Sequence, residues 1–399
     1  MKKTINSSVS SLKPHRRKPS AVSDLLALFP TYRKRDFQRQ INELRTDYMK
    51  ELREAYLHVG LALYVGAGVS RSIGLPSWPE LIRALTLTMM TKKVKPAFAK
   101  FGKLKEEKYW QAIAMIQEAV KKNVDYDKPM LMMARAIKDE LKEDLPFAII
   151  RTLSWHLRRR YYMMNRQVGL DQSRKHYSPL LNALVSLARS ERDAKGVQAI
   201  VNYNYDDTLD TALRDGNVRC ITVKAGKDRV PQGALPCYHV HGVLPTLMPV
   251  PARIDLLRNT GEYGNFVFSE DEYHSEYSDP YRWSNMTQIS LLGRYTGLFV
   301  GLSLEDPNIR RLVDVTHRQY PESHNYAILP RKHSLAKSKD TKETVLRNLF
   351  EQVETASFEK IGVRVIWVDG FEEVSYILHE ICTGEKTTSD IHLHGEDKR

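Results

Sequence analysis

A glycine-rich turn directly after a buried-strand pattern is the first stretch of this sequence that could do chemistry. The apolar residues 61–65 are followed by Gly66-Ala67-Gly68 and then by Ser70. Glycine adopts positive φ easily and brings no Cβ toward a ligand, so a phosphate could rest on the backbone amides of this turn. The spacing departs from the G-x-G-x-x-G fingerprint of dinucleotide-binding proteins, because the next glycine is Gly74. A strand-to-helix turn without a ligand is the alternative.

Three further stretches bring polar side chains to the ends of apolar runs. In chain order they are Asn204-Tyr205-Asp206, His241-Gly242, and Gly301-Leu302-Ser303 followed by Asp306-Pro307-Asn308. The imidazole of His241 has an ordinary pKa near neutral pH, which suits a general base, and Gly242 beside it lets a ligand approach closely. Together, the four strand ends are a more specific signal of a nucleotide site than any one of them alone.

Each of these polar residues also has a purely structural interpretation. Helix capping is open to Asn204, Asp206, Asp207 and Asp306. Because Asp207 is available as a cap, our interpretation leaves Asp206 for catalysis. For Asp306 the capping role and the ligand-binding role are equally open. His241 could be a core histidine bonded to the backbone, although its place before a glycine at a strand end favours catalysis. We interpret His239, two residues earlier on the same strand face, as structural or as a support for the residues that contact the ligand.

A sheet must hold these strand ends together. Short apolar runs alternate with helical segments in the second half of the chain, at residues 197–201, 218–223, 237–240, 266–268, 298–302, 326–329 and 363–368. This alternation predicts a Rossmann-like α/β fold with a mostly parallel sheet that is covered by helices on both faces. Such sheets bind ligands beyond the carboxyl ends of their strands. We therefore expect the four polar stretches to meet at one edge of the sheet.

The region between the first strand and the second shows almost no strand signal. Its apolar residues recur at steps of three and four, which is typical of helices. We therefore predict an all-helical insertion at residues 91–195 within an α/β domain formed by residues 24–90 and 196–384. A basic flexible arm at residues 1–23 and a polar tail at residues 385–399 complete the predicted organisation.

Basic residues outnumber acidic ones, which gives the chain a formal net charge of +13. A polyanionic partner such as nucleic acid and a solvated basic surface explain this charge equally well. Within the insertion, lysines surround Phe98 and Phe101, and a second basic cluster occupies residues 158–160. Nucleic-acid contact is one interpretation of these clusters, and a solvated helix face is the commoner one.

Cysteine content and hydropathy exclude several classes of protein. The chain has 399 residues, of which 42% are hydrophobic, so it can bury a large core. Its three cysteines include no C-x-x-C pair, and we predict neither a disulfide framework nor a zinc or other metal site. No apolar run approaches the ~20 residues that span a bilayer, and the N-terminus lacks the apolar core of a signal peptide. These features predict a cytoplasmic protein without membrane contact.

The order and strand-end placement of the four polar stretches resemble the sirtuin family. The chain is more similar still to the sirtuin-like NAD hydrolase domains of bacterial anti-phage defence proteins. The resemblance covers about residues 58–384, without the helical insertion. The size and the basic, helix-rich character of the chain resemble the stand-alone subunit that is encoded beside a HerA-type DNA-translocating ATPase, which implies such an ATPase as a partner.

The resemblance implies that NAD lies across the carboxyl edge of the sheet as a substrate. Its diphosphate would be bound by Gly66, Ala67, Gly68 and Ser70, while Gly301, Ser303 and Asn308 would lie near its adenosine half. Asn204, Asp206 and His241 would surround the nicotinamide ribose. Cleavage of the bond from C1′ to nicotinamide builds an oxocarbenium-like centre, which needs an uncharged polar group to place water and a base of near-neutral pKa. Asn204 and His241 fit these two roles, and Asp206 could orient either group.

Two departures from sirtuin deacetylases point to hydrolysis of NAD itself. Residues 243–300 contain no cysteine, so the four-cysteine zinc ribbon is missing, and Ser77-Trp78-Pro79 replaces the acidic-aromatic-basic triplet of deacetylases. The resemblance thus implies an NAD glycohydrolase, which yields nicotinamide and ADP-ribose and starves an infected cell of NAD. The alternative is a nucleotide-sensing subunit that binds DNA or an ATPase, with or without nuclease activity. A protein deacetylase or ADP-ribosyltransferase is the least supported function.

The apolar stripes of the helical insertion favour a homo-oligomer.

Overall fold

The computed structural model describes residues 34–100, 111, 114–120, 130–168, 177–189, 194–246, 266–331 and 341–385. The predicted basic arm at residues 1–23 lies outside these ranges, as does the predicted polar tail beyond residue 385. Parts of the predicted helical insertion lie outside them too, and the boundaries of that insertion stay a prediction.

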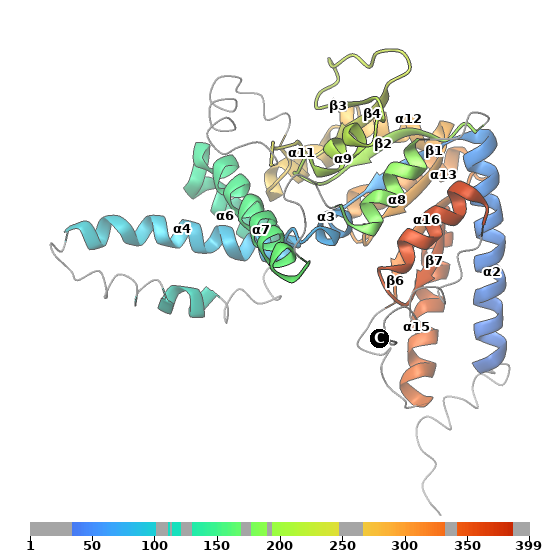
Figure 1. Cartoon of the computed structure of the whole chain (residues 1–399), viewed down its shortest axis with the longest axis horizontal. Coiled ribbons are helices and arrows are strands. Elements are labelled where there is room, and N and C mark those ends of the chain that lie inside the picture. Colours follow the sequence, from blue (N-terminus) through green and yellow to red (C-terminus); the bar gives the residue numbers. More distant parts are fainter. Residues whose placement is uncertain are drawn as a thin grey trace, which may run out of the picture.

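Seven strands form one sheet in which every neighbouring pair runs parallel (Figure 1). Their order across the sheet is β3-β4-β2-β1-β5-β6-β7. The strands are β1 (Leu61–Val65), β2 (Val197–Asn202), β3 (Cys220–Val223), β4 (Leu235–His239), β5 (Thr296–Val300), β6 (Asn325–Pro330) and β7 (Val363–Val368). The predicted Rossmann-like α/β fold is confirmed, and the sheet is parallel throughout the described residues.

Helices cover both faces of this sheet, as the sequence predicts. Successive side chains of β1 point to opposite faces, so Leu63 and Tyr64 belong to two separate hydrophobic cores. The first core packs against α2 (Lys34–Glu54), α8 (Pro179–Ala188), α9 (Thr208–Asp215) and α16 (Glu373–Thr383). The second packs against α12 (Trp283–Arg294), α13 (Pro307–Gln319) and α15 (Thr341–Glu359). Among the described helices, none combines the length and the apolar character that a membrane span requires.

The prediction of a strand at residues 266–268 is wrong. The segment belongs to no strand, and the backbone N–H of Val267 donates to the carbonyl of His241 (3.2 Å). The ring of Phe266 stacks on Tyr205, with 4.6 Å between the ring centroids. Both partners follow the carboxyl ends of strands, so the segment lies at that edge of the sheet. It looks like a strand in the sequence because Val267 and Phe268 are buried.

Every element that the structure describes between β1 and β2 is helical. These elements are α3 (Ala67–Ser72), α4 (Trp78–Lys100), α6 (Met130–Leu141), α7 (Leu145–Val168) and α8, with short helical turns at Lys142–Asp144. α4 packs against α6 and α7, and these helices extend to one side of the sheet in Figure 1. α6 also contacts α11 (Glu270–Ser278), where Lys138 forms an ion pair with Asp271 (2.6 Å). The predicted insertion therefore contacts, through α6, a helix that belongs to the second half of the chain.

The strand order reverses at the centre of the sheet. From β1 the chain first builds β2, β3 and β4 on one side, and then returns to build β5, β6 and β7 on the other. Such a reversal opens a crevice beyond the carboxyl ends of the central strands, where open α/β sheets bind ligands. Gly66 follows β1 and Gly301 follows β5. The fold therefore brings both glycine turns to this point.

Candidate active site

The two glycine turns pack directly against each other. The backbone N–H of Gly66 donates to the carbonyl of Val300 (3.2 Å). The backbone N–H of Gly68 donates to the carbonyl of Gly301 (2.9 Å), whose φ is +69°. A Cβ on Gly68 would lie 2.6 Å from the Cα of Gly301. The close approach of two backbones therefore requires these glycines, and the amides of Gly66 and Gly68 are already bonded within the protein.

Gly68→Ala is expected to lower the free energy of unfolding by about 1–3 kcal/mol, because the added methyl group would overlap the backbone of Gly301. Urea unfolding of the purified variant measures this loss. Gly233→Ala is the comparison, since its Cβ would meet no atom within 4 Å and only its φ of +75° is unfavourable. A Gly68→Ala variant as stable as wild type would show that the turns are not packed this closely.

A cavity of about 290 Å³ lies beside the two turns. Six of the predicted site residues line it, namely Ala67, Ser70, Asn204, Asp206, His241 and Ser303. Aromatic rings from four further residues, Trp78, Tyr203, Tyr205 and Tyr273, form part of its wall. The other predicted residues, Gly66, Gly68, Gly301 and Asn308, do not belong to this wall. The structure thus brings the three predicted catalytic residues together in one cavity, with part of the predicted ligand-binding set.

Asn204 connects the end of β2 to the first glycine turn. Its side-chain Nδ2 donates to the carbonyl of Gly66 (3.0 Å), and its backbone N–H donates to the Oδ1 of Asn202 (2.9 Å). The side chain is held in place by these contacts while it lines the cavity. Its carboxamide oxygen can accept a hydrogen bond from a water molecule or a hydroxyl group in that cavity.

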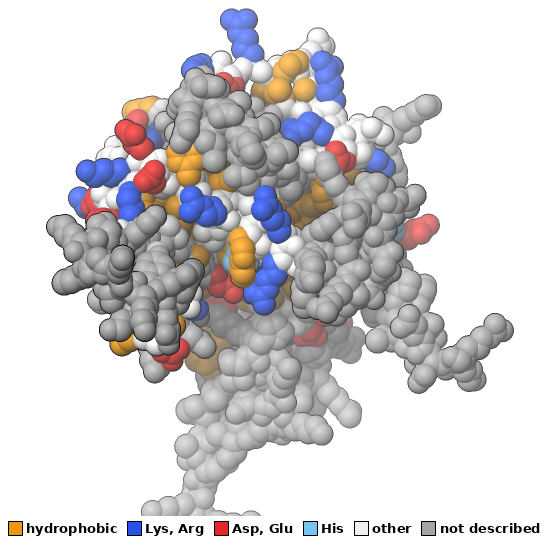
Figure 2. All heavy atoms as spheres, turned by 60° about the vertical axis from the view of Figure 1, so that its left-hand side comes forward, with side chains coloured by type: hydrophobic (Ala, Val, Ile, Leu, Met, Phe, Trp, Pro, Cys, Tyr) orange, Lys and Arg blue, Asp and Glu red, His pale blue; other side chains and the backbone are white. Residues whose placement is uncertain are grey.

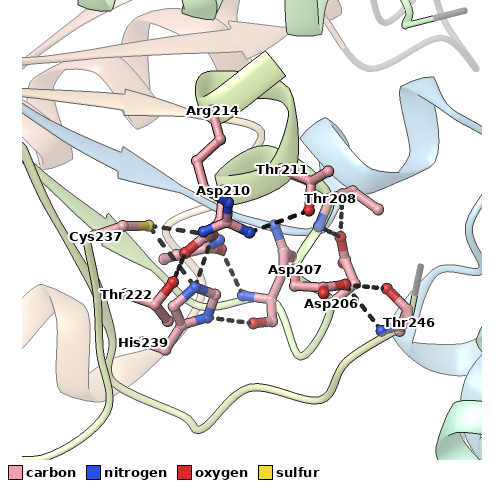
Figure 3. Close-up of polar contacts among 12 residues, drawn as sticks. Asp206, Asp207, Thr208, Asp210, Thr211, Arg214, Thr222, Cys237, His239 and Thr246 are labelled. Carbon is pink, nitrogen blue, oxygen red and sulfur yellow. Dashed lines mark hydrogen bonds and ion pairs between the residues drawn. The ribbon is translucent and has the colours of Figure 1, made fainter. Parts of the chain in front are cut away.

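Asp206 holds two elements together and is not a free carboxylate. It accepts hydrogen bonds from the hydroxyl of Ser70 (2.6 Å) and from the backbone N–H of Thr208 at the start of α9 (3.2 Å). Burial raises the pKa of Asp206 above its ordinary value, although the hydrogen bonds from Ser70 and Thr208 act in the opposite direction. Asp207 is occupied elsewhere, because its carboxylate accepts from the backbone N–H of Thr246 (2.8 Å) (Figure 3). The prediction that Asp207 caps the following helix and leaves Asp206 for catalysis is therefore wrong, because Asp206 accepts from the first turn of α9.

His241 lies at the cavity wall between two tyrosine rings. Its imidazole meets Tyr203 edge-on at 5.0 Å and Tyr273 at 5.5 Å between ring centroids. The residue is 8% exposed, and loss of solvation lowers the pKa of His241 to about 4 despite the nearby carboxylate of Asp306. The imidazole is therefore neutral at physiological pH and able to accept a proton. Its position at the cavity agrees with the predicted catalytic role better than with that of a core histidine.

Asp306 caps α13 and also faces the cavity. Its Oδ1 accepts from the backbone N–H of Asn308 (2.7 Å) and from that of Ile309 (3.4 Å), which confirms the capping interpretation. Burial, together with the nearby carboxylate of Asp306, raises the pKa of Tyr273 well above its usual range. Asn308 itself is buried, and its Oδ1 accepts from Arg311 (2.7 Å). Its side chain is thus bonded within the protein, away from the cavity wall.

Tyr273 is the cavity residue that sequence reasoning missed most clearly. It belongs to α11, which begins at a capping box formed by Ser269 and Glu272. The S-x-x-E pattern predicts the start of this helix, but the face on which Tyr273 lies depends on how α11 packs. The only sequence signal was an aromatic residue in the first turn of a helix that follows an apolar run. Its proximity to His241 cannot be predicted from the sequence, because the two residues are far apart in the chain.

A buried ion pair between His239 and Asp210 joins β4 to α9 (Figure 3). The Nε2 of His239 is 2.9 Å from the Oδ2 of Asp210, and its Nδ1 is 3.3 Å from the carbonyl oxygen of Asn204. Desolvation favours the neutral forms, but mutual attraction and hydrogen bonding outweigh it, so the pKa of His239 is raised and that of Asp210 is lowered. Both ring nitrogens can then donate, one of them to the backbone of Asn204. His239 is therefore structural, as predicted, and it supports the loop that carries Asn204.

The same cluster contains the group that could hold a metal ion. The Sγ of Cys237 lies 3.5 Å from Asp210 Oδ2 and 3.7 Å from His239 Nε2, and all three residues are buried. Such a set suits a zinc-like cation, although the sequence predicts no metal site. The 2.9 Å between His239 and Asp210 is, however, an ordinary hydrogen-bond length, and a structural zinc site has four protein ligands. An ion pair therefore explains this geometry without a metal.

We expect metal removal to leave the stability of the protein unchanged, because a proton on His239 already satisfies Asp210. Thermal unfolding would be measured after dialysis against a chelator and again after addition of zinc chloride. A melting temperature that falls with the chelator and recovers with zinc, together with one zinc ion per chain by elemental analysis, would instead identify the cluster as a metal site.

Comparison with known proteins gives one family match. A family model described as a SIR2-like domain matches residues 198–363, and a search of curated proteins gave no match. The matched range contains Asn204, Asp206, His241 and Ser303, but it begins after the first glycine turn. The match supports a sirtuin-like domain and is consistent with an NAD-related activity.

Proposed function

We propose that the protein is an NAD glycohydrolase, which cleaves NAD to nicotinamide and ADP-ribose. One observation carries this proposal: the carboxamide of Asn204 and the neutral imidazole of His241 line the same cavity, at the point where the strand order reverses. The SIR2-like match, which runs from β2 to the start of β7, supports NAD as the substrate.

The cavity suits the nicotinamide end of NAD. A volume of about 290 Å³ is at the lower limit of small-molecule sites, so it would hold the nicotinamide ring and its ribose, with the diphosphate near Ser70 and Ser303. Uncharged aromatic rings on the wall, including Trp78 and Tyr205, can pack against a flat heterocycle. Nicotinamide carries positive charge in NAD and loses it on leaving, and a weakly polar wall favours the neutral product.

Three polar residues divide the chemistry among them in this proposal. As the bond to nicotinamide breaks, charge develops at C1′ of the ribose. The carboxamide oxygen of Asn204 orients water or a ribose hydroxyl toward that carbon, and His241 accepts the proton that is released. Asp206 is fixed by Ser70 and Thr208, so it positions the Ser70 hydroxyl and the turn and does not itself take the proton.

The low pKa of His241 predicts the pH dependence of this reaction. Because the neutral imidazole is the active form, kcat/KM should stay constant from about pH 8 down to about pH 6, and it should fall as the pH approaches the pKa of about 4. If His241 had the ordinary pKa of 6.5, kcat/KM would already fall as the pH drops through 6.5. Rates would be measured between about pH 4 and pH 8, with circular dichroism to confirm folding. A midpoint near 6.5 would contradict the proposed state of His241.

We extend the proposal to the role of the enzyme in the cell. The motif resemblance supports a cytoplasmic anti-phage defence protein that depletes NAD, works as a homo-oligomer, and is controlled by a HerA-type ATPase. Control is needed on physical grounds, because an unregulated NAD hydrolase would deplete its own cell. The net charge of +13 supports nucleic acid as a further partner.

A nucleotide-sensing subunit is the second candidate, and one observation favours it. Asn204 and Asp206 already make hydrogen bonds inside the protein, as expected for a cavity that binds a nucleotide without cleaving it. The deciding experiment follows NAD and released nicotinamide over time by chromatography, with the purified protein alone and with a HerA-type ATPase added. Nicotinamide release supports the hydrolase. NAD binding in a calorimeter without turnover in either mixture would assign the protein to the second class.

A further inference from the structure

One face of α7 is basic, aromatic and exposed. The 24 residues of this helix include five arginines and neither aspartate nor glutamate. Arg151, Trp155, Arg158 and Arg159 are spaced at four, seven and eight residues from the first, which places them along one side of the helix. All four side chains are exposed, and Trp155 keeps 55% of its surface accessible. We call these four residues the α7 stripe.

The arginines of the α7 stripe lack the acidic partners that neighbouring basic residues have. Lys92 pairs with Asp144 (2.7 Å), and Lys138 pairs with Asp271 (2.6 Å). Within the part of the chain that the structure describes, no ion pair joins a stripe arginine to an acidic side chain. Unpaired positive charge on one helix face attracts polyanions.

Trp155 gives the α7 stripe a stacking surface. The guanidinium carbon of Arg159 lies 5.4 Å from the centre of the indole ring, which is a cation–π contact. His156 meets the same ring edge-on at 4.9 Å between centroids. An exposed tryptophan beside unpaired arginines presents a flat face on which another planar ring can stack.

The α7 stripe lies close to the candidate active site. Leu153, on the same helix, lines the cavity that contains His241. The side of the molecule that carries α4, α6 and α7 is turned toward the viewer in Figure 2, where lysine and arginine side chains gather around hydrophobic ones near the middle of the face. A partner bound to the α7 stripe would therefore lie next to the elements that enclose the cavity.

We propose that the α7 stripe is a binding site for single-stranded nucleic acid. A base stacks on the indole of Trp155, while Arg151, Arg158 and Arg159 bind the phosphates on either side. Single strands fit this surface better than duplexes, because the bases of a duplex are already stacked on one another. The carboxylates of an acidic protein would pair with the arginines, but they would not stack on the exposed indole as a nucleic-acid base does. The inference does not depend on NAD cleavage.

Fluorescence anisotropy of a labelled oligo(dT) of about 20 nucleotides, added to the full-length protein without NAD, tests the proposal. Trp155→Ala should weaken binding about 5- to 100-fold with little change in salt dependence, because it removes stacking and no charge. Arg158→Gln should reduce the slope of log K against log salt by about 0.7. Arg318→Gln is the matched control, since Arg318 is an exposed helix arginine that is paired with Asp314, and it should leave binding unchanged.

Competition separates nucleic acid from other partners. Unlabelled single strands should displace the probe at lower concentrations than a duplex, heparin or anionic lipid vesicles of equal total charge. Equal displacement by heparin, together with wild-type affinity of Trp155→Ala, would overturn the proposal in favour of charge attraction alone. Light scattering covers the remaining case: if Trp155→Ala dissociates an oligomer and keeps oligo(dT) affinity, the stripe is a contact between copies of the chain. Thermal unfolding confirms that the surface variants fold.

Discussion

The His241→Ala variant should cleave NAD about 10²–10⁴-fold more slowly than wild type, with KM changed only a few-fold. The imidazole contributes when the proton moves in the transition state, so its loss affects kcat far more than the binding of intact NAD. Release of nicotinamide under saturating NAD gives kcat directly. Added imidazole should restore part of the activity, because the truncated side chain leaves a space in the cavity wall where a small base can bind.

Two controls make this result interpretable. His58→Ala removes a histidine that is 69% exposed, precedes the amino end of β1 and does not line the cavity, so this variant should retain full activity. NAD affinity measured by calorimetry should be similar for wild type and His241→Ala, which separates loss of chemistry from loss of binding. Full activity of a correctly folded His241→Ala variant would exclude the proposed base. Loss of both activity and NAD affinity would assign His241 to binding.

The sequence allowed the sheet and its functional edge to be predicted because both depend on local patterns. Buried parallel strands are continuous apolar runs, and polar residues at the ends of such runs must meet at one edge. This logic brought Asn204, Asp206 and His241 to one cavity. It failed at residues 266–268, because Val267 and Phe268 are buried outside the sheet and a buried apolar run in the sequence does not show which element covers it.

The remaining errors come from contacts between distant parts of the chain. Asp207 cannot serve as the expected cap because Thr246, 39 residues away, binds its carboxylate. Tyr273 reaches His241 through the packing of α11, and Leu153 reaches the cavity through that of α7. Single positions in a helix carry no sign of such contacts, since the 3.6-residue period gives the buried face but not its neighbour. The cavity wall therefore had to be seen in three dimensions.

Asp210→Asn should lower the free energy of unfolding by about 3–5 kcal/mol near pH 5.5, because it leaves His239 without its counter-charge in a fully buried position. The loss should shrink as the pH rises. The raised pKa of His239 contributes stability that is complete below its ordinary value of 6.5 and is lost as the pH rises through the folded-state value. The lowered pKa of Asp210 contributes stability above its ordinary value of 3.8. The ion pair therefore stabilises the folded state most between about pH 3.8 and pH 6.5.

Urea unfolding of wild type and Asp210→Asn at several pH values from about 5 to 8 measures this difference. Asp314→Asn is the matched control, because it removes a carboxylate from an exposed pair with Arg318, and it should cost less than about 1 kcal/mol at every pH. A loss for Asp210→Asn that does not depend on pH would mean that His239 is neutral and that the contact is an ordinary hydrogen bond. The other ring nitrogen of the charged His239 can donate to the carbonyl of Asn204, and this contact depends on Asp210. Asp210→Asn should therefore also slow NAD cleavage, although it changes no residue of the cavity wall.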